Sequence, residues 1–304
     1  MHEQLPIRVR ILVEASLSDN THRMYQSALR KFSAWCAYRG HCALPAAPLT
    51  ISEYLADLLA AGRRGSTLKV HAAAIAYHHR RADLENPVKA YLVRAVLRGS
   101  MRLRGGYVDQ KRPVVSEDIA CILQHVPPTL KGIRDRALIA LGFAGAFRRS
   151  ELAALRFEDL TFSESGVEVL IRGSKTDFAR KGVSIGIPTG RHLRPVAALQ
   201  TWIAAAGITR GPLFRPVYRG RALAQSISPQ TVSRMLKSYL QKSHLDAAQY
   251  GAHSLRAGCI TNAAEHGVDI DRIMDHSRHF CRHNVRIYIR RANLFRDHPG
   301  ADFL

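Results

Sequence analysis

The feature that most constrains the fold is a run of four helical patterns between residues 15 and 100. In each pattern apolar residues recur three or four positions apart, and no strand-like alternation interrupts the run. Capping residues and glycines mark where the helices should begin and end. Helices with one apolar stripe must pack against one another, which predicts a small helical domain. The predicted helices are 21–38, ending before Gly40, one that starts with a capping box at Thr50–Glu53, one from Ser66 and one from Asn86–Pro87.

Residues 105–115 have no periodicity and contain Gly105, Gly106 and Pro113, so we expect a linker there. It separates an N-terminal domain, residues 1–104, from a C-terminal domain, residues 116–304. Two alternating runs, 167–172 and 183–187, predict strands within the second domain. Helical patterns surround them, so the predicted fold is mainly α with a small antiparallel β-sheet. These helices are expected at 116–126, 133–147, 192–206, 229–242, 253–266, 270–276 and around Tyr288.

The formal charge of +21 points to a polyanionic partner. Residues 1–112 hold 18 Lys and Arg against 8 Asp and Glu, and the remaining excess of 11 positive charges lies in residues 113–304. Two domains of the same sign favour nucleic acid over the alternative of a merely basic protein. Six cations at helix edges of the first domain are predicted to bind DNA, although a charge run is more often a solvated face: Arg63, Arg64, Lys69, Arg98, Arg102 and Arg104.

The sequence also bounds the compartment. Five scattered cysteines, an odd number, are typical of reduced thiols in a cytosolic protein. No apolar run reaches eighteen residues, and the N-terminus has no signal-peptide pattern. We therefore expect a cytoplasmic, nucleoid-associated protein with no membrane partner.

Two clusters carry side chains suited to phosphodiester chemistry. In Phe147–Leu152, Arg148 and Glu151 stand three positions apart, within ion-pairing reach on a helix. In the loop Gly173–Gly182, between the two predicted strands, Lys175 could reach a ligand that a helical body holds. Taken singly, a surface ion pair and a solvated basic loop are the commoner interpretations.

The C-terminal part supplies the remaining groups. His253 and Arg256 share a helical face, and His279 stands nine residues before Tyr288. The spacing around Tyr288 also fits an ordinary core tyrosine. A zinc site is the rival interpretation of the histidine-rich run, but no second group of ligands has finger-like spacing, so no metal is predicted. The residues of that run are His276, His279, Cys281 and His283.

In this combination and order, the sequence resembles the tyrosine recombinase/integrase family of the phage-integrase type, with a layout most like its Cre and Xer branches. The resemblance implies a helical, SAM-like core-binding domain followed by an α+β catalytic domain. By matching motifs, the implied catalytic residues are Arg148, Lys175, His253, Arg256, His279 and Tyr288, with Glu151 in support. Arg149, Lys181 and His276 compete with Arg148, Lys175 and His279, and Ser277-Arg278-His279 departs from the Leu-Gly-His that many members have.

The implied function is site-specific DNA recombination through a 3′-phosphotyrosine intermediate and a Holliday junction. Such an enzyme needs no metal, ATP or other cofactor. Its implied partners are double-stranded DNA with inverted-repeat sites and three further copies of the chain in a homo-tetramer. Two alternatives stay open: a type IB topoisomerase or telomere resolvase with the same chemistry, and a DNA-binding accessory protein that no longer cuts.

Overall fold

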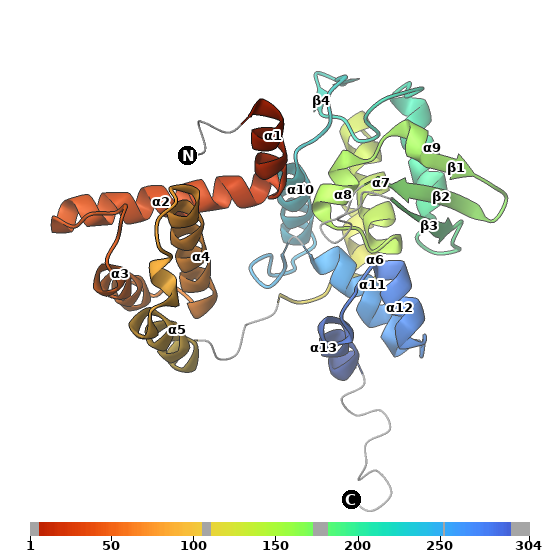
Figure 1. The fold of residues 1–304 in the computed structure, drawn as a ribbon. Helices are drawn as coiled ribbons and strands as arrows, with labels where there is room; N and C mark the ends of the chain where they lie inside the picture. The colour runs from red at the N-terminus through yellow and green to blue at the C-terminus, as the bar shows by residue number, and fades with distance from the viewer. Residues whose placement is uncertain (1–5, 105–110, 173–181, 252, 293–304) are drawn as a thin grey trace, which may run out of the picture. The chain divides into compact units, whose positions relative to one another are not determined.

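The computed structural model describes residues 6–104, 111–172, 182–251 and 253–292 (Figure 1). The chain divides into two compact units, Met1–Asp109 and Gln110–Leu304. Each unit has a hydrophobic core of its own. The division falls within the stretch where the sequence loses its periodicity.

In the described part of the N-terminal unit, all the regular secondary structure is helical. Its elements are α1 (Ile7–Ala15), α2 (Asp19–Arg39), α3 (Pro48–Ala60), α4 (Gly65–Arg81), a 3-10 turn (Pro87–Lys89) and α5 (Tyr91–Arg104). The core forms where the apolar stripes of α2 to α5 meet, and its central side chains are Phe32, Leu55, Leu68 and Val93, all fully buried. Helix α1 was not predicted from the sequence, and none of its residues is buried.

Local sequence explains where these helices begin. The Ser18 hydroxyl accepts the backbone N–H of Thr21 at 3.3 Å and caps α2. The predicted capping box at Thr50 is wrong, because α3 begins at Pro48 and Thr50 is buried inside it. Proline suits the first helical turn, where a backbone N–H has no partner to lose. Asn86 caps the 3-10 turn rather than the following helix.

The C-terminal unit is built around α7 (Leu130–Ala144). Ala137, Leu138, Ile139 and Leu141 are fully buried, so the second half of this helix is covered on all sides by its neighbours. The other helices of the unit, by their bounds, are α6 (Ser116–Gln124), α8 (Arg149–Ala154), a 3-10 turn (Phe157–Asp159), α9 (Pro195–Ala205), α10 (Pro229–Lys242), α11 (Ser254–Glu265), α12 (Ile270–Ser277) and α13 (Arg282–Ala292).

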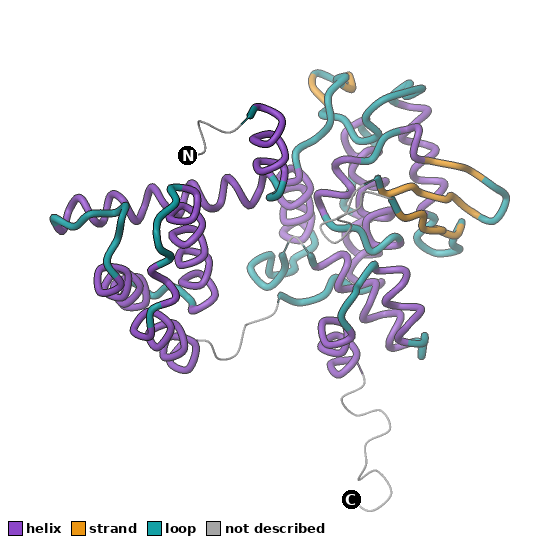
Figure 2. The backbone as a smooth tube through the Cα atoms, viewed as in Figure 1, coloured by secondary structure: helices purple, strands orange, loops and turns teal. Residues whose placement is uncertain are grey.

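A three-stranded antiparallel sheet completes this unit, in the order β1 (Leu160–Phe162), β2 (Gly166–Ile171) and β3 (Val183–Pro188) (Figure 2). Val169 of β2 pairs with Leu160 on one side and Ile185 on the other. Alternate residues of β2 are buried, as expected for a sheet with one covered face. The predicted fold class, mainly α with a small antiparallel sheet, is confirmed. A short hairpin of β4 (Val217–Tyr218) and β5 (Arg221–Ala222) was not predicted.

One close approach sets the position of α11. The backbone N–H of Val114 donates to the Ser254 carbonyl at 2.9 Å. A Cβ on Gly258 would lie 1.7 Å from the Val114 carbonyl oxygen, so only glycine fits there. The chain entering the unit therefore holds the first turns of α11, which carry Arg256, against α7.

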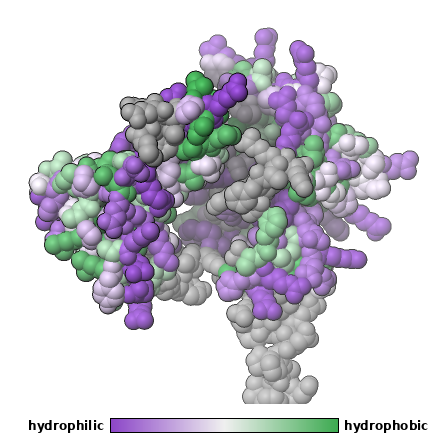
Figure 3. All heavy atoms as spheres, in the orientation of Figure 1, coloured by the Kyte–Doolittle hydropathy of each residue, from purple (hydrophilic) through white to green (hydrophobic). Residues whose placement is uncertain are grey.

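Polar side chains predominate on the face of the two units that Figure 3 shows. In Figure 3 hydrophilic side chains project over each of them, with apolar ones interspersed. Within the described ranges, no helix is both long and apolar enough to cross a membrane.

Candidate active site

The first arginine motif forms a tight, buried ion pair. Arg148 is the N-cap residue of α8, and Glu151 stands at the third helical position. The Arg148 guanidinium donates to Glu151 Oε1 at 2.5 Å, and its backbone N–H donates to Oε2 at 2.9 Å. The two side chains are 14% and 2% exposed. Arg149, the rival arginine, instead donates to the Ser233 hydroxyl of α10 at 3.3 Å.

Arg256 lies beside this pair. It is 5% exposed, and its Nη1 donates to the Ala146 carbonyl at 2.8 Å. Ala146 adopts a positive φ of 44°, which turns the chain sharply between α7 and α8. Burial and then the charge of Arg148 lower the pKa of Arg256 to about 9, so the guanidinium stays charged at neutral pH.

His279 is held between Arg256 and a buried serine. Its Nε2 lies 3.2 Å from Arg256 Nη2, and its Nδ1 lies 2.7 Å from the Ser277 hydroxyl oxygen. Ser277 donates its own hydrogen to the Ile273 carbonyl at 2.6 Å. The hydrogen-bond network therefore assigns the ring proton of neutral His279 to Nδ1. Burial and then the charge of Arg256 lower the pKa of His279 to about 4.

His276, which competed with His279 in the sequence, points elsewhere. Its Nε2 donates to the Ala144 carbonyl at 2.8 Å. Burial lowers its pKa, so it is neutral near pH 7. Within the described ranges, no three His, Cys, Asp or Glu side chains gather as metal ligands.

His253 and Tyr288 complete the described part of the site. His253 precedes α11 as its N-cap residue and is exposed, although protein atoms lie around its ring. Desolvation of the ring by the protein around it, and then the charge of Arg256, lower the pKa of His253. Tyr288 lies on α13, partly buried against Val285 and Ile260. Its phenol is near enough to the Arg256 guanidinium for the two to interact electrostatically. Lys175 and its rival Lys181 lie outside the described residues.

The structure therefore brings the Arg148–Glu151 pair and the Arg256–His279 pair close enough for their charges to interact, with His253 and Tyr288 at their edge. It also adds a residue that the sequence analysis did not select, Arg278, which is buried and donates to Glu151 Oε2 at 3.1 Å. The only sequence signal was its unusual place before His279. Positive charge exceeds negative in this buried centre, which is suited to bind a phosphate diester.

The cations predicted to bind DNA are all exposed. A Cβ on Gly65, the first residue of α4, would meet Met101 of α5 at 2.7 Å, so these two helix ends touch. A Cβ on Gly62 would lie 3.5 Å from an Arg104 guanidinium nitrogen. The start of α4 and the end of α5 therefore form one cationic cluster, here called the α4–α5 cluster, of Arg63, Arg64, Arg102 and Arg104. Its binding to DNA stays a prediction.

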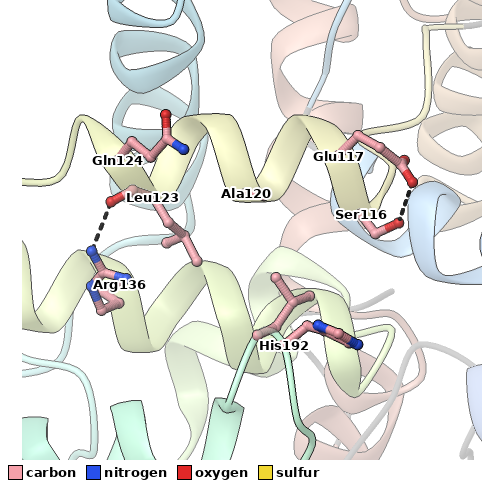
Figure 4. A pocket seen from close by; sticks show the side chains of 8 residues that line it. Ser116, Glu117, Ala120, Leu123, Gln124, Arg136 and His192 are labelled. Atoms are coloured by element: carbon pink, nitrogen blue, oxygen red, sulfur yellow. Dashed lines mark hydrogen bonds between the residues drawn. The ribbon is translucent and has the colours of Figure 1, made fainter.

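A surface pocket of about 580 Å³ lies in the C-terminal unit, between α6 and α7 and beside His192 (Figure 4). Arg136 closes one side by donating to the Leu123 carbonyl at 2.7 Å, and Ser116 donates to Glu117 at 3.1 Å at the other end of α6. None of the described site residues lines it.

Comparison with known proteins decides the family. The family model "Phage integrase family" matches residues 114–294, and the model of the phage integrase N-terminal SAM-like domain matches residues 10–86. An integrase/recombinase xerD homolog of Selenomonas ruminantium is 37% identical over 303 residues, which are 97% of this chain and 89% of that protein. The chain belongs to the phage integrase family. The resemblance to tyrosine recombinases seen in the sequence is confirmed.

Other members of the phage integrase family agree. The recombinase Cre of Escherichia phage P1 is 26% identical over 282 residues, 85% of this chain and 80% of Cre. In fold, the chain is similar to lambda integrase in a dimer bound to a COC′ core site, with a TM-score of 0.63 and 19% identity over 95% of both chains. The chain is also similar to lambda integrase in a tetramer bound to a Holliday junction, with a TM-score of 0.60 and 18% identity over 92% of this chain and 74% of that one. The family consists of DNA strand-transferring enzymes, so the chain is a tyrosine-type site-specific recombinase. These relatives do not support the topoisomerase or the accessory protein.

Proposed function

We propose that Tyr288 is the nucleophile that cleaves DNA, at a centre where Arg148, Arg256 and His279 hold the scissile phosphate. The observation that carries the proposal is the meeting of two guanidiniums and an imidazole from distant sequence positions, with Tyr288 in electrostatic reach. Phosphoryl transfer asks chiefly for positioning and charge stabilisation, which two fixed guanidiniums provide.

Cleavage exchanges a phosphodiester bond in DNA for one to the enzyme. The Tyr288 oxygen attacks phosphorus, the bond to the 5′-oxygen breaks, and a 3′-phosphotyrosine forms. His253 takes the phenol proton, and its lowered pKa keeps it neutral and ready to accept one. Lys175 gives a proton to the leaving 5′-oxygen. A 5′-hydroxyl from the partner strand then attacks the phosphotyrosine in reverse, so neither ATP nor a metal ion takes part.

His279 has a supporting role in this scheme. In the DNA-free chain its Nε2 lone pair faces Arg256. A bound phosphate adds negative charge beside the ring and favours its protonated form. His279 Nε2 then donates a hydrogen bond to the phosphate. Arg256 Nη2, which faced His279 in the free chain, turns toward the phosphate as well.

The N-terminal unit and the assembly are part of the proposal. The α4–α5 cluster, with Lys69 and Arg98, contacts the DNA backbone as the core-binding domain, residues 1–104, and residues 105–115 link it to the catalytic domain, residues 116–304. Support comes from the exposure of these cations and from lambda integrase, which was crystallised with DNA and as a tetramer on a Holliday junction. Four copies of the chain would pair two inverted-repeat sites at the nucleoid, in the cytoplasm.

The test is recombination between two labelled duplexes. A target site is first identified by sequencing DNA that is captured by the protein. Two duplexes that carry this site, one fluorescent and one longer, are then incubated with the chain in EDTA. We expect exchanged products and a tetrameric synapse. Relaxation of supercoiled DNA at arbitrary sequence without exchange would favour the topoisomerase instead.

A further inference from the structure

Arg278 occupies a place that the proposed chemistry does not use. Its side chain is 3% exposed and reaches from the end of α12 under the turn between α7 and α8. There Nη1 donates to the Gly145 carbonyl at 3.1 Å and to the His276 carbonyl at 2.8 Å. Nη2 donates to the Ala146 carbonyl at 2.8 Å and to Glu151 Oε2 at 3.1 Å. The guanidinium carbon also lies 5.4 Å from the centre of the Phe147 ring.

The backbone of this residue makes the choice of arginine notable. Arg278 ends α12 with φ 58° and ψ 49°, in the left-handed region that disfavours every residue with a Cβ. Glycine is the usual residue for this helix-ending conformation. Arg278 adopts this unfavourable backbone conformation, and its side chain, which a glycine would lack, makes four hydrogen bonds.

Two of those four bonds end on groups that also hold the other two arginines. Glu151, which accepts from Arg278, also accepts from the side chain and backbone of Arg148. The Ala146 carbonyl, which accepts from Arg278, also accepts from Arg256. The Arg278 carbonyl itself accepts from Arg148 Nη2 at 3.3 Å. Arg278 is thus bonded to a direct partner of each arginine.

We propose that Arg278 is a positioning residue for strand cleavage, which fixes Glu151 and the Gly145–Ala146 turn and through them the guanidiniums of Arg148 and Arg256. The proposal rests on the proposed function, because it presumes that these two arginines hold the scissile phosphate. Arg278 does not touch the phosphate. With Arg148 and Arg256, Arg278 brings the number of positive charges near the Glu151 carboxylate to three. This excess also keeps the centre electropositive before DNA binds.

The decisive variant is Arg278→Gly, which suits the left-handed backbone and removes only the side chain. We expect single-turnover cleavage of a nicked suicide duplex to slow about 100-fold, because misplacing a reacting group by about 1 Å has that effect. Affinity for the uncleaved duplex should stay within about threefold of the wild type, because exposed cations supply most of it. Arg194→Gly is the matched control. It makes the same exchange at a positive φ of 45°, on an exposed residue, and should cleave at the wild-type rate.

A double variant separates positioning from general loss of packing. If Arg278 acts through Glu151, Arg278→Gly should slow cleavage much less in a Glu151→Gln background than in the wild type. Equal losses in both backgrounds would overturn the proposal. So would a wild-type cleavage rate in Arg278→Gly, or a loss of DNA binding as large as the loss of cleavage.

Arg278→Lys keeps the test valid if the glycine variant does not fold. A single ammonium cannot bridge the two turn carbonyls and Glu151 as the guanidinium does. We expect Arg278→Lys to fold and to cleave about tenfold more slowly than the wild type, since outer residues that orient reacting groups have effects of that size. Cleavage at the wild-type rate would contradict the proposal. If the wild type itself forms no covalent adduct, the proposed function fails rather than the role of Arg278.

Discussion

The C-terminal unit contains two buried arginine clusters that differ in net charge: one is balanced and the other has an excess of positive charge. Arg134 donates to Asp135 at 2.6 Å, and these side chains are 4% and 1% exposed. The Tyr239 hydroxyl donates to the other Asp135 oxygen at 3.0 Å. In this cluster, the Asp135 cluster, one buried cation is matched by one buried anion.

The second cluster, the Glu151 cluster, is unbalanced. Three buried or nearly buried guanidiniums, those of Arg148, Arg256 and Arg278, surround the single carboxylate of Glu151. Burial, with the charges of Arg256 and Arg148, lowers the pKa of His253 and of His279. Burying excess charge disfavours folding unless something else compensates it. The comparison indicates that a balanced buried pair serves the fold, whereas an unbalanced one is prepared for an anion from outside.

The largest effect is expected where the balanced cluster is broken. Asp135→Asn leaves the Arg134 guanidinium buried and without its counter-ion, which should lower the free energy of unfolding by about 3–5 kcal/mol. Urea denaturation measures this loss. Cleavage per folded molecule should stay at the wild-type level at low temperature. A catalytic defect without a loss of stability would contradict the structural role of the Asp135 cluster.

The unbalanced cluster should respond in the opposite way. Arg256→Met removes one of three guanidiniums, so cleavage should fall about 100- to 1,000-fold, as when one preorganised donor to a transition-state oxygen is lost. The free energy of unfolding should change by less than about 1 kcal/mol, because an excess buried charge is removed. The same two assays apply. If Arg256→Met mainly unfolds the chain, the two clusters are alike and the contrast fails.

Exposed cations form a third case beside the two buried clusters, because they need no buried counter-ion. Arg102→Ala combined with Arg104→Ala should weaken DNA binding and reduce the log–log salt slope by about 1.8, at about 0.9 for each phosphate that is no longer neutralised. Fluorescence anisotropy between low and moderate salt measures the slope. Arg23→Ala, an exposed arginine of α2, is the control and should leave it unchanged. A salt slope equal to that of the wild type in the double variant would remove Arg102 and Arg104 from the DNA-binding surface.

The smallest effect is a pH dependence of stability. Unfolded His279 has its ordinary pKa of about 6.5, and the folded value is about 4. Between these values the unfolded chain binds more protons, so the stability present above pH 6.5 declines as the pH falls toward 4. His279→Gln should show a weaker decline, and the remainder comes from other groups with lowered pKa values, among them His71, His78, His253 and His276. The midpoints of urea unfolding at pH 7, 5.5 and 4.5 measure this decline for the wild type and for His279→Gln. Identical declines in the two proteins would refute the environment assigned to His279.

Sequence periodicity predicted much of the fold. Helix α10 was predicted with its observed bounds, Pro229–Lys242, because Val232, Leu236 and Leu240 form a regular buried stripe. Helix α1 escaped prediction because it buries no side chain, so it has no such stripe. Strand β1 has only three residues, too few for alternation to be recognised.

The site was predictable to the extent that its residues follow local spacing. Arg148 and Glu151 pair because they are three positions apart at a helix start, and His253 and Arg256 flank the first turn of α11. Arg278 could not be predicted, because its side chain turns inward from a left-handed residue at a helix end. Neither helical nor strand periodicity applies to such a position.

The proposed chemistry depends on attack by Tyr288 on a phosphate that the Glu151 cluster holds. The most direct measurement traps the wild-type chain on a nicked suicide duplex in EDTA, digests the adduct and identifies the nucleotide-bearing residue by mass spectrometry. We expect a 3′-phosphate linked to Tyr288, and no adduct with Tyr288→Phe, which should still bind the duplex. A nucleotide attached to another residue, or an adduct that persists in Tyr288→Phe, would contradict it.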